Sequence, residues 1–240
     1  MNWIKRNPIL VIFLVLMIIS RVNSGAFSSP ADFLLNMILL IPGVVIGITV
    51  HEFMHAFAAW KFGDSTPMRM GRVTLNPLAH IEPIGIITLL FAGFGWGKPV
   101  MVNPYAFTTY RRLKNIVVDV AGTALNFVVA FLFTGLLITT SLTFGQGAPL
   151  TTLVSNIVSM NLVLMLFNLL PIPPLDGFGI ITEIFDLRRF HWYQTFYNSG
   201  SIILLILILF GIIGPLLGPA LQGIFAFMQN TWLPAFGAAF

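Results

Sequence analysis

The sequence predicts an all-α polytopic membrane protein, and three observations support that fold class. Of the 240 residues, 57% are hydrophobic and only 8% are charged, whereas a soluble domain carries roughly a quarter charged residues. Several apolar stretches approach the roughly 20 residues that a helix needs to cross a bilayer. The sparse basic residues fall between these stretches. The same composition excludes a disordered chain and gives no basic cluster of the kind that binds nucleic acid.

We expect about five or six transmembrane helices in a single domain that covers residues 1–240. The candidate segments are 8–20, 33–60, 84–97, 116–139, 153–170 and 201–217. The first of them follows Lys5 and Arg6 and also has the pattern of a cleavable signal peptide. Because Arg21 stands just before the candidate cleavage site, we expect a retained helix instead.

The third segment, residues 84–97, is too short to cross. As a helix it would span about 21 Å, less than the roughly 30 Å of the hydrocarbon layer. Gly93, Gly95 and Gly97 also disfavour a helix. The segment is therefore predicted to be a re-entrant loop, and because irregular backbone at this depth needs cover from protein or water, the loop should line a cavity.

The basic residues predict the orientation, because they collect on the cytoplasmic side of membrane proteins. With the N-terminus inside and a third segment that does not cross, only Arg21 among the 12 Lys and Arg residues lies outside. The predicted location is a cell membrane, with the N-terminus cytoplasmic. Between the second and third segments, Met68, Met70, Val73 and Leu75 alternate with polar residues, which predicts a short membrane-associated β-hairpin over residues 65–77.

The second segment contains ionisable residues that are costly inside a bilayer and usually mark function there. They are His51, Glu52 and His55, in the pattern H-E-x-x-H. Residues four apart share one face of a helix, so both imidazoles can bind one metal ion. Glu52 follows the first histidine and can act as general base on an attacking water. An ordinary polar helix face is a weak alternative, because these groups need a compensating partner in an apolar helix.

A catalytic zinc takes three protein ligands and keeps one position open. Five residues are candidates for the third ligand: Asp64, His80, Glu82, Asp119 and Asp176. Asp64 fits a solvated helix end, and Arg111, Arg112 and Lys114 can neutralise Asp119. Asp176 follows a Pro-Pro-Leu run that surface decoration explains poorly, and the predicted topology returns it to the histidine side. We prefer Asp176, with His80 as the second choice.

Taken together, these motifs resemble the site-2 protease family of intramembrane zinc metalloproteases. The resemblance covers roughly residues 50–179, and we assign the catalytic core to residues 33–180. The matching runs, in chain order, are His51 to His55, Gly71 to Pro77 with His80 and Pro83, Gly93 to Val100, Gly122 to Asn126, and Asn168 to Gly177. Many relatives have proline after the glycine of the fourth run, where this chain has Thr123.

The resemblance implies that His51, His55 and Asp176 hold Zn²⁺ and that Glu52 is the base. It also implies that Asn168 positions the substrate or stabilises the oxyanion. The implied reaction is hydrolysis of peptide bonds within or near transmembrane segments of membrane-protein substrates, in regulated intramembrane proteolysis. Family members often carry a PDZ or CBS domain; neither fits here, so we expect a minimal member.

Two other classes of function remain open at this point. A divalent-metal transporter would also bury histidine and aspartate, and a non-catalytic membrane scaffold would also bind client helices. A transporter predicts polar residues along a path through the whole bilayer, whereas residues 201–217 are apolar apart from Ser201. A scaffold has no need of Glu52. The expected partners are a transmembrane helix of the substrate and the lipid bilayer, with no nucleic acid; the oligomeric state stays open.

Overall fold

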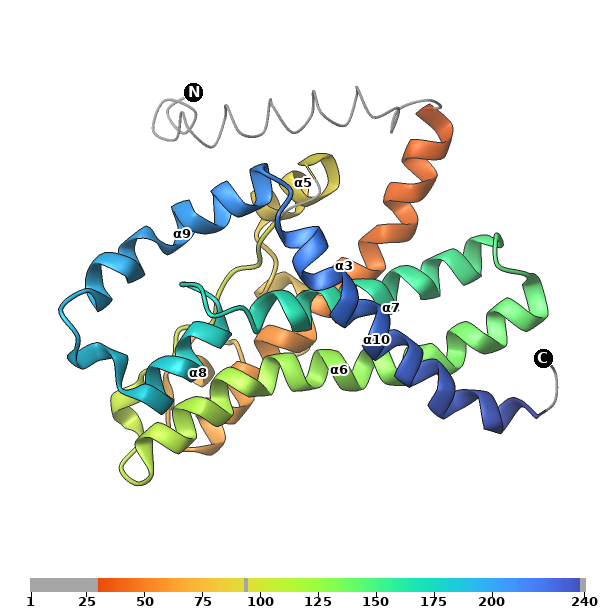
Figure 1. Ribbon diagram of the computed structural model, residues 1–240. Coiled ribbons are helices and arrows are strands. Elements are labelled where there is room, and N and C mark those ends of the chain that lie inside the picture. The colour runs from red at the N-terminus through yellow and green to blue at the C-terminus, as the bar shows by residue number, and fades with distance from the viewer. Residues whose placement is uncertain (1–29, 93–94, 238–240) are drawn as a thin grey trace.

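The computed structural model describes residues 30–92 and 95–237, and regular structure within these ranges is helical (Figure 1). The α-helices and the 3-10 helices (η) are, in chain order, α3 (Pro30–Lys61), α4 (Thr66–Arg69), η1 (Pro77–Ala79), α5 (Pro83–Ala92), η2 (Pro104–Ala106), α6 (Arg111–Phe144), α7 (Pro149–Asn168), α8 (Asp176–Phe185), η3 (Leu187–Arg189), α9 (Tyr193–Leu209), α10 (Ile213–Trp232) and η4 (Leu233–Phe236).

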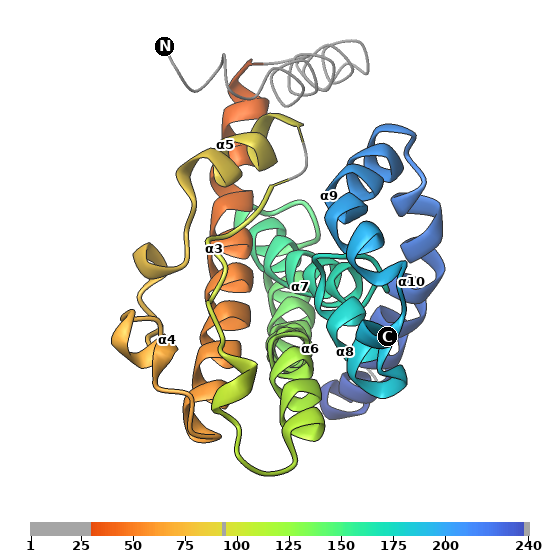
Figure 2. The ribbon, with the colours of Figure 1, turned by 90° about the vertical axis from the view of Figure 1, so that its left-hand side faces the viewer.

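The long helices α3, α6 and α7 pack against one another and form the centre of the molecule (Figures 1 and 2). Small residues let them approach closely, as is common for helices in membranes. A Cβ atom on Gly43 of α3 would lie 2.7 Å from the carbonyl oxygen of Asn156 in α7. Where α6, α7 and α10 meet, the buried apolar side chains are Ala130, Leu137, Val154, Val158, Leu162, Met165 and Met228.

Three helices are long and apolar enough to cross a membrane: α3, α6 and α7. They correspond to the predicted segments 33–60, 116–139 and 153–170, and they support a membrane protein. The described residues hold a fourth candidate only if α9 and the α10–η4 segment form one broken span. The predicted helix over residues 8–20 lies outside the described residues, so the predicted total of five or six is not decided.

The predicted apolar segment over residues 201–217 is not one continuous helix. Helix α9 ends at Leu209, and the chain turns by 81° before the α10–η4 segment. Gly211 lies in the turn with a φ of 66°, a left-handed conformation that favours glycine. Pro215 then stands in the first turn of α10, where its missing N–H costs no helix hydrogen bond. Hydrophobicity alone did not reveal this break, because every residue around it is apolar.

The predicted β-hairpin is also wrong. Residues 65–77 contain the one-turn helix α4 and tight turns, and no strand. Pro67 stands in the first turn of α4, and the N–H of Thr66 donates to Asp64 Oδ1 at 2.9 Å. Arg72 is buried and donates to the carbonyl oxygens of Ala79, Lys98 and Pro99. Arg72, one of the polar residues in the alternating pattern, therefore has a buried side chain and does not belong to the exposed face of a strand.

The segment predicted to be re-entrant contains α5, a short helix at the level of the first half of α3 (Figures 1 and 2). From residue 95 the chain returns without helix toward η2. Gly97 lies against Ile48 of α3, and the N–H of Lys98 donates to the His80 carbonyl at 2.7 Å. The chain thus runs from the end of α3 back along it and returns to the start of α6 (Figure 2), which is the path expected of a re-entrant loop.

Basic side chains gather at the end of the bundle where α3 ends and α6 begins. Arg112 forms an ion pair with Asp186 at 2.7 Å, and the Lys114 ammonium lies 5.8 Å from the ring centroid of Phe62. Lys61 lies over Trp60 at 4.7 Å. Membrane proteins collect lysine and arginine mainly in their cytoplasmic loops, and they place tryptophan at both membrane interfaces. This end of the bundle is therefore suited to a membrane–water interface.

Candidate metal centre

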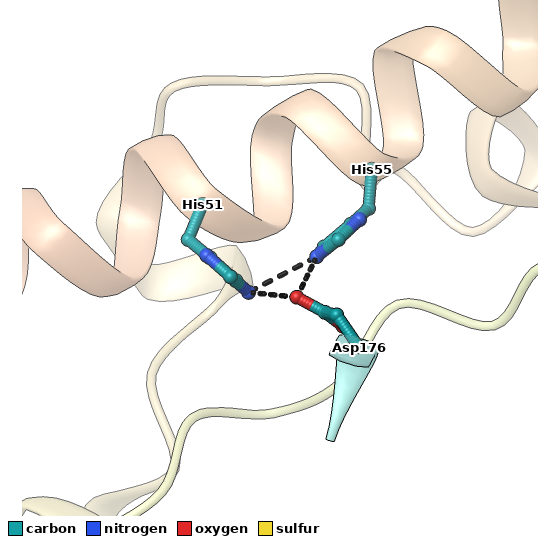
Figure 3. A group of neighbouring side chains, drawn as sticks. All are labelled: His51, His55 and Asp176. Carbon is teal, nitrogen blue, oxygen red and sulfur yellow. Dashed lines mark hydrogen bonds and ion pairs between the residues drawn. The ribbon is translucent and has the colours of Figure 1, made fainter. Parts of the chain in front are cut away.

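His51 and His55 lie on one face of α3 and point toward the same place (Figure 3). Their Nε2 atoms are 3.0 Å apart, and both side chains are buried. The i, i+4 spacing brings the rings together as the sequence predicted. Both residues lie well inside α3, so the imidazoles stand within the helix bundle and away from its ends.

Asp176 completes the group from the first residue of α8 (Figure 3). Its Oδ2 atom lies 3.2 Å from His51 Nε2 and 3.3 Å from His55 Nε2. Close packing at Gly177 holds this turn against the end of α7, because a Cβ atom there would lie 2.2 Å from the Leu169 carbonyl oxygen. Among the candidates for the third ligand, the structure therefore brings Asp176 to the histidine pair.

The hydrogen bonds of the imidazoles fix which nitrogen can bind a metal. His55 Nδ1 lies 2.7 Å from the carbonyl oxygen of Val118, which only accepts, so in the neutral ring Nδ1 carries the proton. His51 Nδ1 is 2.7 Å from Asn126 Oδ1 and is a donor for the same reason. Both Nε2 atoms consequently direct lone pairs toward each other and toward Asp176.

Three acceptors that face one another are unfavourable without a cation between them. Asp176 Oδ2 is buried and has no hydrogen-bond donor among the described residues. Two zinc ligands in a tetrahedral site lie about 3.3–3.5 Å apart, and the separations here are 3.0, 3.2 and 3.3 Å. The two-imidazole, one-carboxylate set also leaves one tetrahedral position open, as in catalytic zinc sites. The residues present thus fit zinc.

The charge at Asp176 is consistent with this arrangement. Burial by itself raises the pKa of the Asp176 carboxyl, and without a metal only protonated, positively charged imidazoles of His55 and His51 would hold its pKa below the ordinary value. The carboxylate is thus paired with positive charge, whether that charge is carried by the imidazoles or by a bound cation. An ionised carboxylate is the form that binds a divalent cation.

Two buried amide side chains, those of Asn126 and Asn161, form a hydrogen-bonded chain that ends at His51 Nδ1. Asn126 Nδ2 donates to the Gly47 carbonyl at 3.0 Å and to Asn161 Oδ1 at 2.9 Å. Asn161 Nδ2 in turn donates to the Ile157 carbonyl at 2.8 Å. These bonds leave Asn126 Oδ1 facing His51, so three helices together set the tautomer of one ligand. From the sequence, Asn126 was predicted only as part of a motif and Asn161 was not predicted, although a polar amide in an apolar helix was a usable signal.

We expect Asn126→Ala to weaken zinc binding by about 10–100-fold, the usual cost of losing a hydrogen bond to a metal-binding histidine. The His51 ring would lose the acceptor that holds its proton on Nδ1. Competition with a chromophoric chelator measures the affinity. Asn156→Ala is the control, because Asn156 lies on the same helix as Asn161 but has no side-chain contact to this network. An unchanged affinity in Asn126→Ala would contradict the orienting role.

Gly122 leaves space for the imidazole rings of His51 and His55. A Cβ atom there would lie 2.5 Å from His55 Nε2 and 2.9 Å from His51 Cε1. Glycine therefore brings the backbone of α6 directly against the ligand atoms. The next residue is Thr123, and its hydroxyl donates to the Val120 carbonyl at 2.8 Å. The α-helix continues through this position without a break.

Glu52 and Asn168, the two predicted catalytic residues, lie near the site without an interaction with the metal-ligand atoms. The Glu52 Oε2 atom accepts a hydrogen bond from the Val100 N–H at 2.9 Å. Asn168 Nδ2 donates to the Leu164 carbonyl at 2.9 Å, at the end of α7. Their catalytic roles stay predictions.

The other candidate ligands have different surroundings. Asp64 is buried, against our expectation of a solvated helix end, and accepts from the backbone N–H groups of Thr66 and Asn103. It therefore ties the start of α4 to the loop before η2. His80 is 0% exposed and its Nε2 lies 2.8 Å from the Thr74 carbonyl. Glu82 precedes α5, and Asp119 lies on α6 beside Gly179.

A cavity of about 340 Å³ opens beside Asp176. Its walls come from α6, α8, the start of α9, and the loops around residues 102–104 and 174–175. Asp119, Asp176 and Glu183 supply carboxylates, Arg188 supplies a guanidinium group, and Phe178, Tyr193 and Tyr197 supply aromatic rings. Asp176, a predicted metal ligand, therefore forms part of the cavity wall.

Comparison with known proteins identifies several curated relatives. "Putative zinc metalloprotease YwhC" of Bacillus subtilis is 41% identical over 151 residues, which are 60% of this chain and 68% of the relative. "Putative zinc metalloprotease Rip2" of Mycolicibacterium smegmatis is 35% identical over 158 residues, which are 63% of this chain and 59% of the relative. Rip2 of Mycobacterium tuberculosis is 34% identical over 165 residues, 66% of this chain and 61% of the relative. The chain thus spans less than two thirds of either Rip2. No family model and no solved structure matches it.

Proposed function

Because the chain belongs to the site-2 protease family of zinc metalloproteases, we propose that it is an intramembrane zinc peptidase. It would hydrolyse peptide bonds within or near the transmembrane segments of other membrane proteins. The observation that carries the proposal is the convergence of His51, His55 and Asp176 inside a bundle of helices that can span a membrane. Zinc is the metal of this family, and the donor set fits it.

Glu52 is the residue that would move the proton. When bound, zinc lowers the pKa of a water to about 7 and polarises the scissile carbonyl. Glu52 accepts the proton of the attacking water and delivers it to the leaving amine. Its Oε2 atom is held by the Val100 N–H, and Gly97 borders Oε1, where a Cβ atom would lie 3.9 Å away. The Val100 N–H thereby holds the carboxylate through one of its two oxygens.

The segment around Val100 is suited to hold an extended substrate. The N–H groups of Lys98 and Val100 donate to His80 and Glu52, which anchors one edge of the segment. The N–H groups of Gly97 and Met101 make no hydrogen bond among the described residues, so they are available to a substrate strand. A helical substrate must unwind here, because a carbonyl that is hydrogen-bonded within a helix is a poor target for attack. Asn168, at the end of α7, is proposed to position the carbonyl.

The proposed setting is a cell membrane, with the N-terminus and the metal site toward the cytoplasm. The basic end of the bundle supports this orientation, because positive residues stay on the cytoplasmic side. The partners would be the bilayer and a transmembrane helix of the substrate, as in regulated intramembrane proteolysis.

The test is cleavage by the purified full chain in lipid vesicles. The probe is a set of fluorescent single-span peptides with helix-weakening residues in the span. We expect cleavage that falls to background when the metal is removed by a chelator and returns with one equivalent of zinc. Zinc content and zinc flux across the vesicle wall are measured in parallel. A zinc-loaded chain that cleaves none of the peptides but transports zinc would refute the peptidase and support a transporter.

A further inference from the structure

Asp119 is a carboxylate that the metal site does not use. It lies on the membrane-spanning helix α6, which rises about 12 Å between Arg111 and Asp119. Ionisable side chains at such depth are expensive and usually have a functional partner. The neutralisation expected from Arg111, Arg112 and Lys114 is not found: Arg112 pairs with Asp186, and Asp119 has no hydrogen bond or ion pair among the described residues.

Asp119 faces the cavity beside Asp176 and is held there by close packing. A Cβ atom on Gly179 would lie 2.3 Å from Asp119 Oδ2, so glycine at this position leaves room for the carboxylate against α8. Gly179 is one helical turn from Asp176, which places Asp119 next to the first turn of the helix that carries the third metal ligand. Both carboxylates line the same space.

The other charges of the cavity are already compensated. Glu183 accepts from Asn115 Nδ2 at 2.8 Å and from Arg188 Nη1 at 2.7 Å. Asp176 would be compensated by the metal. Asp119 is therefore the cavity carboxylate that neither a side chain of the described residues nor the metal would pair, and a cationic group placed beside it would favour its ionised form. Thr182 also lines the cavity and is 1% exposed, and its hydroxyl has no hydrogen-bond partner among the described residues, so its oxygen is available to accept from a ligand donor.

The remaining walls suit the stem and head of a basic side chain. Phe178 and Tyr193 stack with ring centroids 5.7 Å apart, and Tyr197 lies 6.2 Å from Phe178. Aromatic rings attract ammonium and guanidinium groups, and apolar walls accept the methylene stem of lysine or arginine. The volume of about 340 Å³ is ample for one such side chain.

We propose that this cavity is a substrate subsite for a lysine or arginine side chain next to the scissile bond, with Asp119 as its anionic partner. The inference rests on the proposed peptidase function and adds a rule of selectivity to it. Membrane spans carry lysine and arginine at their cytoplasmic ends, so such a pocket would select the end of a substrate helix and set where along it the chain is cut.

The test compares single-span peptides that differ at one position, scanned through the residues on either side of the cleaved bond. Each position carries lysine, arginine, methionine or glutamate, and kcat/KM is measured with the zinc-loaded full chain in vesicles. At one position we expect a preference of about tenfold or more for the basic residues over methionine, the effect of one charged hydrogen bond. Asp119→Asn should reduce this ratio to nearly one while zinc stoichiometry stays the same. Asp186→Asn is the matched control, because it removes a carboxylate outside the cavity and should preserve the ratio.

A binding measurement separates this inference from the peptidase proposal. The zinc-loaded Glu52→Gln variant is titrated with the same peptides by fluorescence anisotropy, and the basic peptides should bind more tightly only while Asp119 is present. If the wild-type chain cleaves no peptide, the peptidase proposal fails, and the binding preference still decides whether the subsite exists. An equal preference with and without Asp119, or no basic preference at any position, would overturn the inference.

Discussion

Asp176→Ala should release the metal and abolish cleavage. The variant leaves only two imidazoles, one fewer protein ligand than a catalytic zinc site requires. Loss of an outer hydrogen bond already costs about 10–100-fold in metal affinity, so loss of a ligand should cost more than about 100-fold. Zinc content of the purified protein and chelator competition measure the effect. The histidine pair would also lose the carboxylate 3.2 and 3.3 Å from its Nε2 atoms.

Asp119→Ala is the matched control for this experiment. It removes a carboxylate from the same cavity, but one that is not among the group of residues able to hold the metal. We expect this variant to keep one zinc per chain. If Asp176→Ala also keeps its zinc at unchanged affinity, the third ligand has been assigned wrongly.

Glu52→Gln should reduce cleavage by about 10²–10⁴-fold, the usual contribution of a general base. Glutamine has the same shape, and its amide oxygen can still accept the Val100 N–H that holds Glu52 now. It cannot take up the proton of the attacking water, so catalysis falls while the local structure stays. Zinc content should be unchanged, because the metal-ligand set does not include Glu52.

The measurement for this variant is kcat/KM on the best-cleaved single-span peptide, together with zinc content. Glu82→Gln is the control, since Glu82 precedes α5 at the other side of the re-entrant segment, and it should leave cleavage unaffected. Full activity of Glu52→Gln would refute the base assignment.

The central helices and the convergence of His51, His55 and Asp176 could be predicted from patterns in continuous stretches of the sequence. A helix that spans a membrane needs a long apolar run, and α3, α6 and α7 each have one. The i, i+4 spacing put His51 and His55 on one face of α3, and the proline-rich run before Asp176 indicated a turn and not a helix. Each of these signals is contained in one continuous stretch of the sequence.

The errors arose where distant residues decide the structure. In the sequence, Arg72 fitted the polar face of a strand. In the fold its side chain is buried and donates to three carbonyl groups, and those of Lys98 and Pro99 lie far along the chain. The bend after Leu209 lies in an apolar stretch and depends on the packing of α10 against α6 and α7. Asn161 joins the His51 network only because α7 crosses α6 at Asn126, and Asp119 reaches the cavity only because Gly179 leaves it space.

The most direct test of the metal centre is anomalous diffraction at the zinc edge from crystals of the zinc-loaded full chain. We expect one strong peak bounded by His51 Nε2, His55 Nε2 and Asp176 Oδ2, at about 2.0–2.2 Å from each of these atoms. A peak held by other residues, or no peak among these three atoms in a protein that contains zinc, would contradict the account.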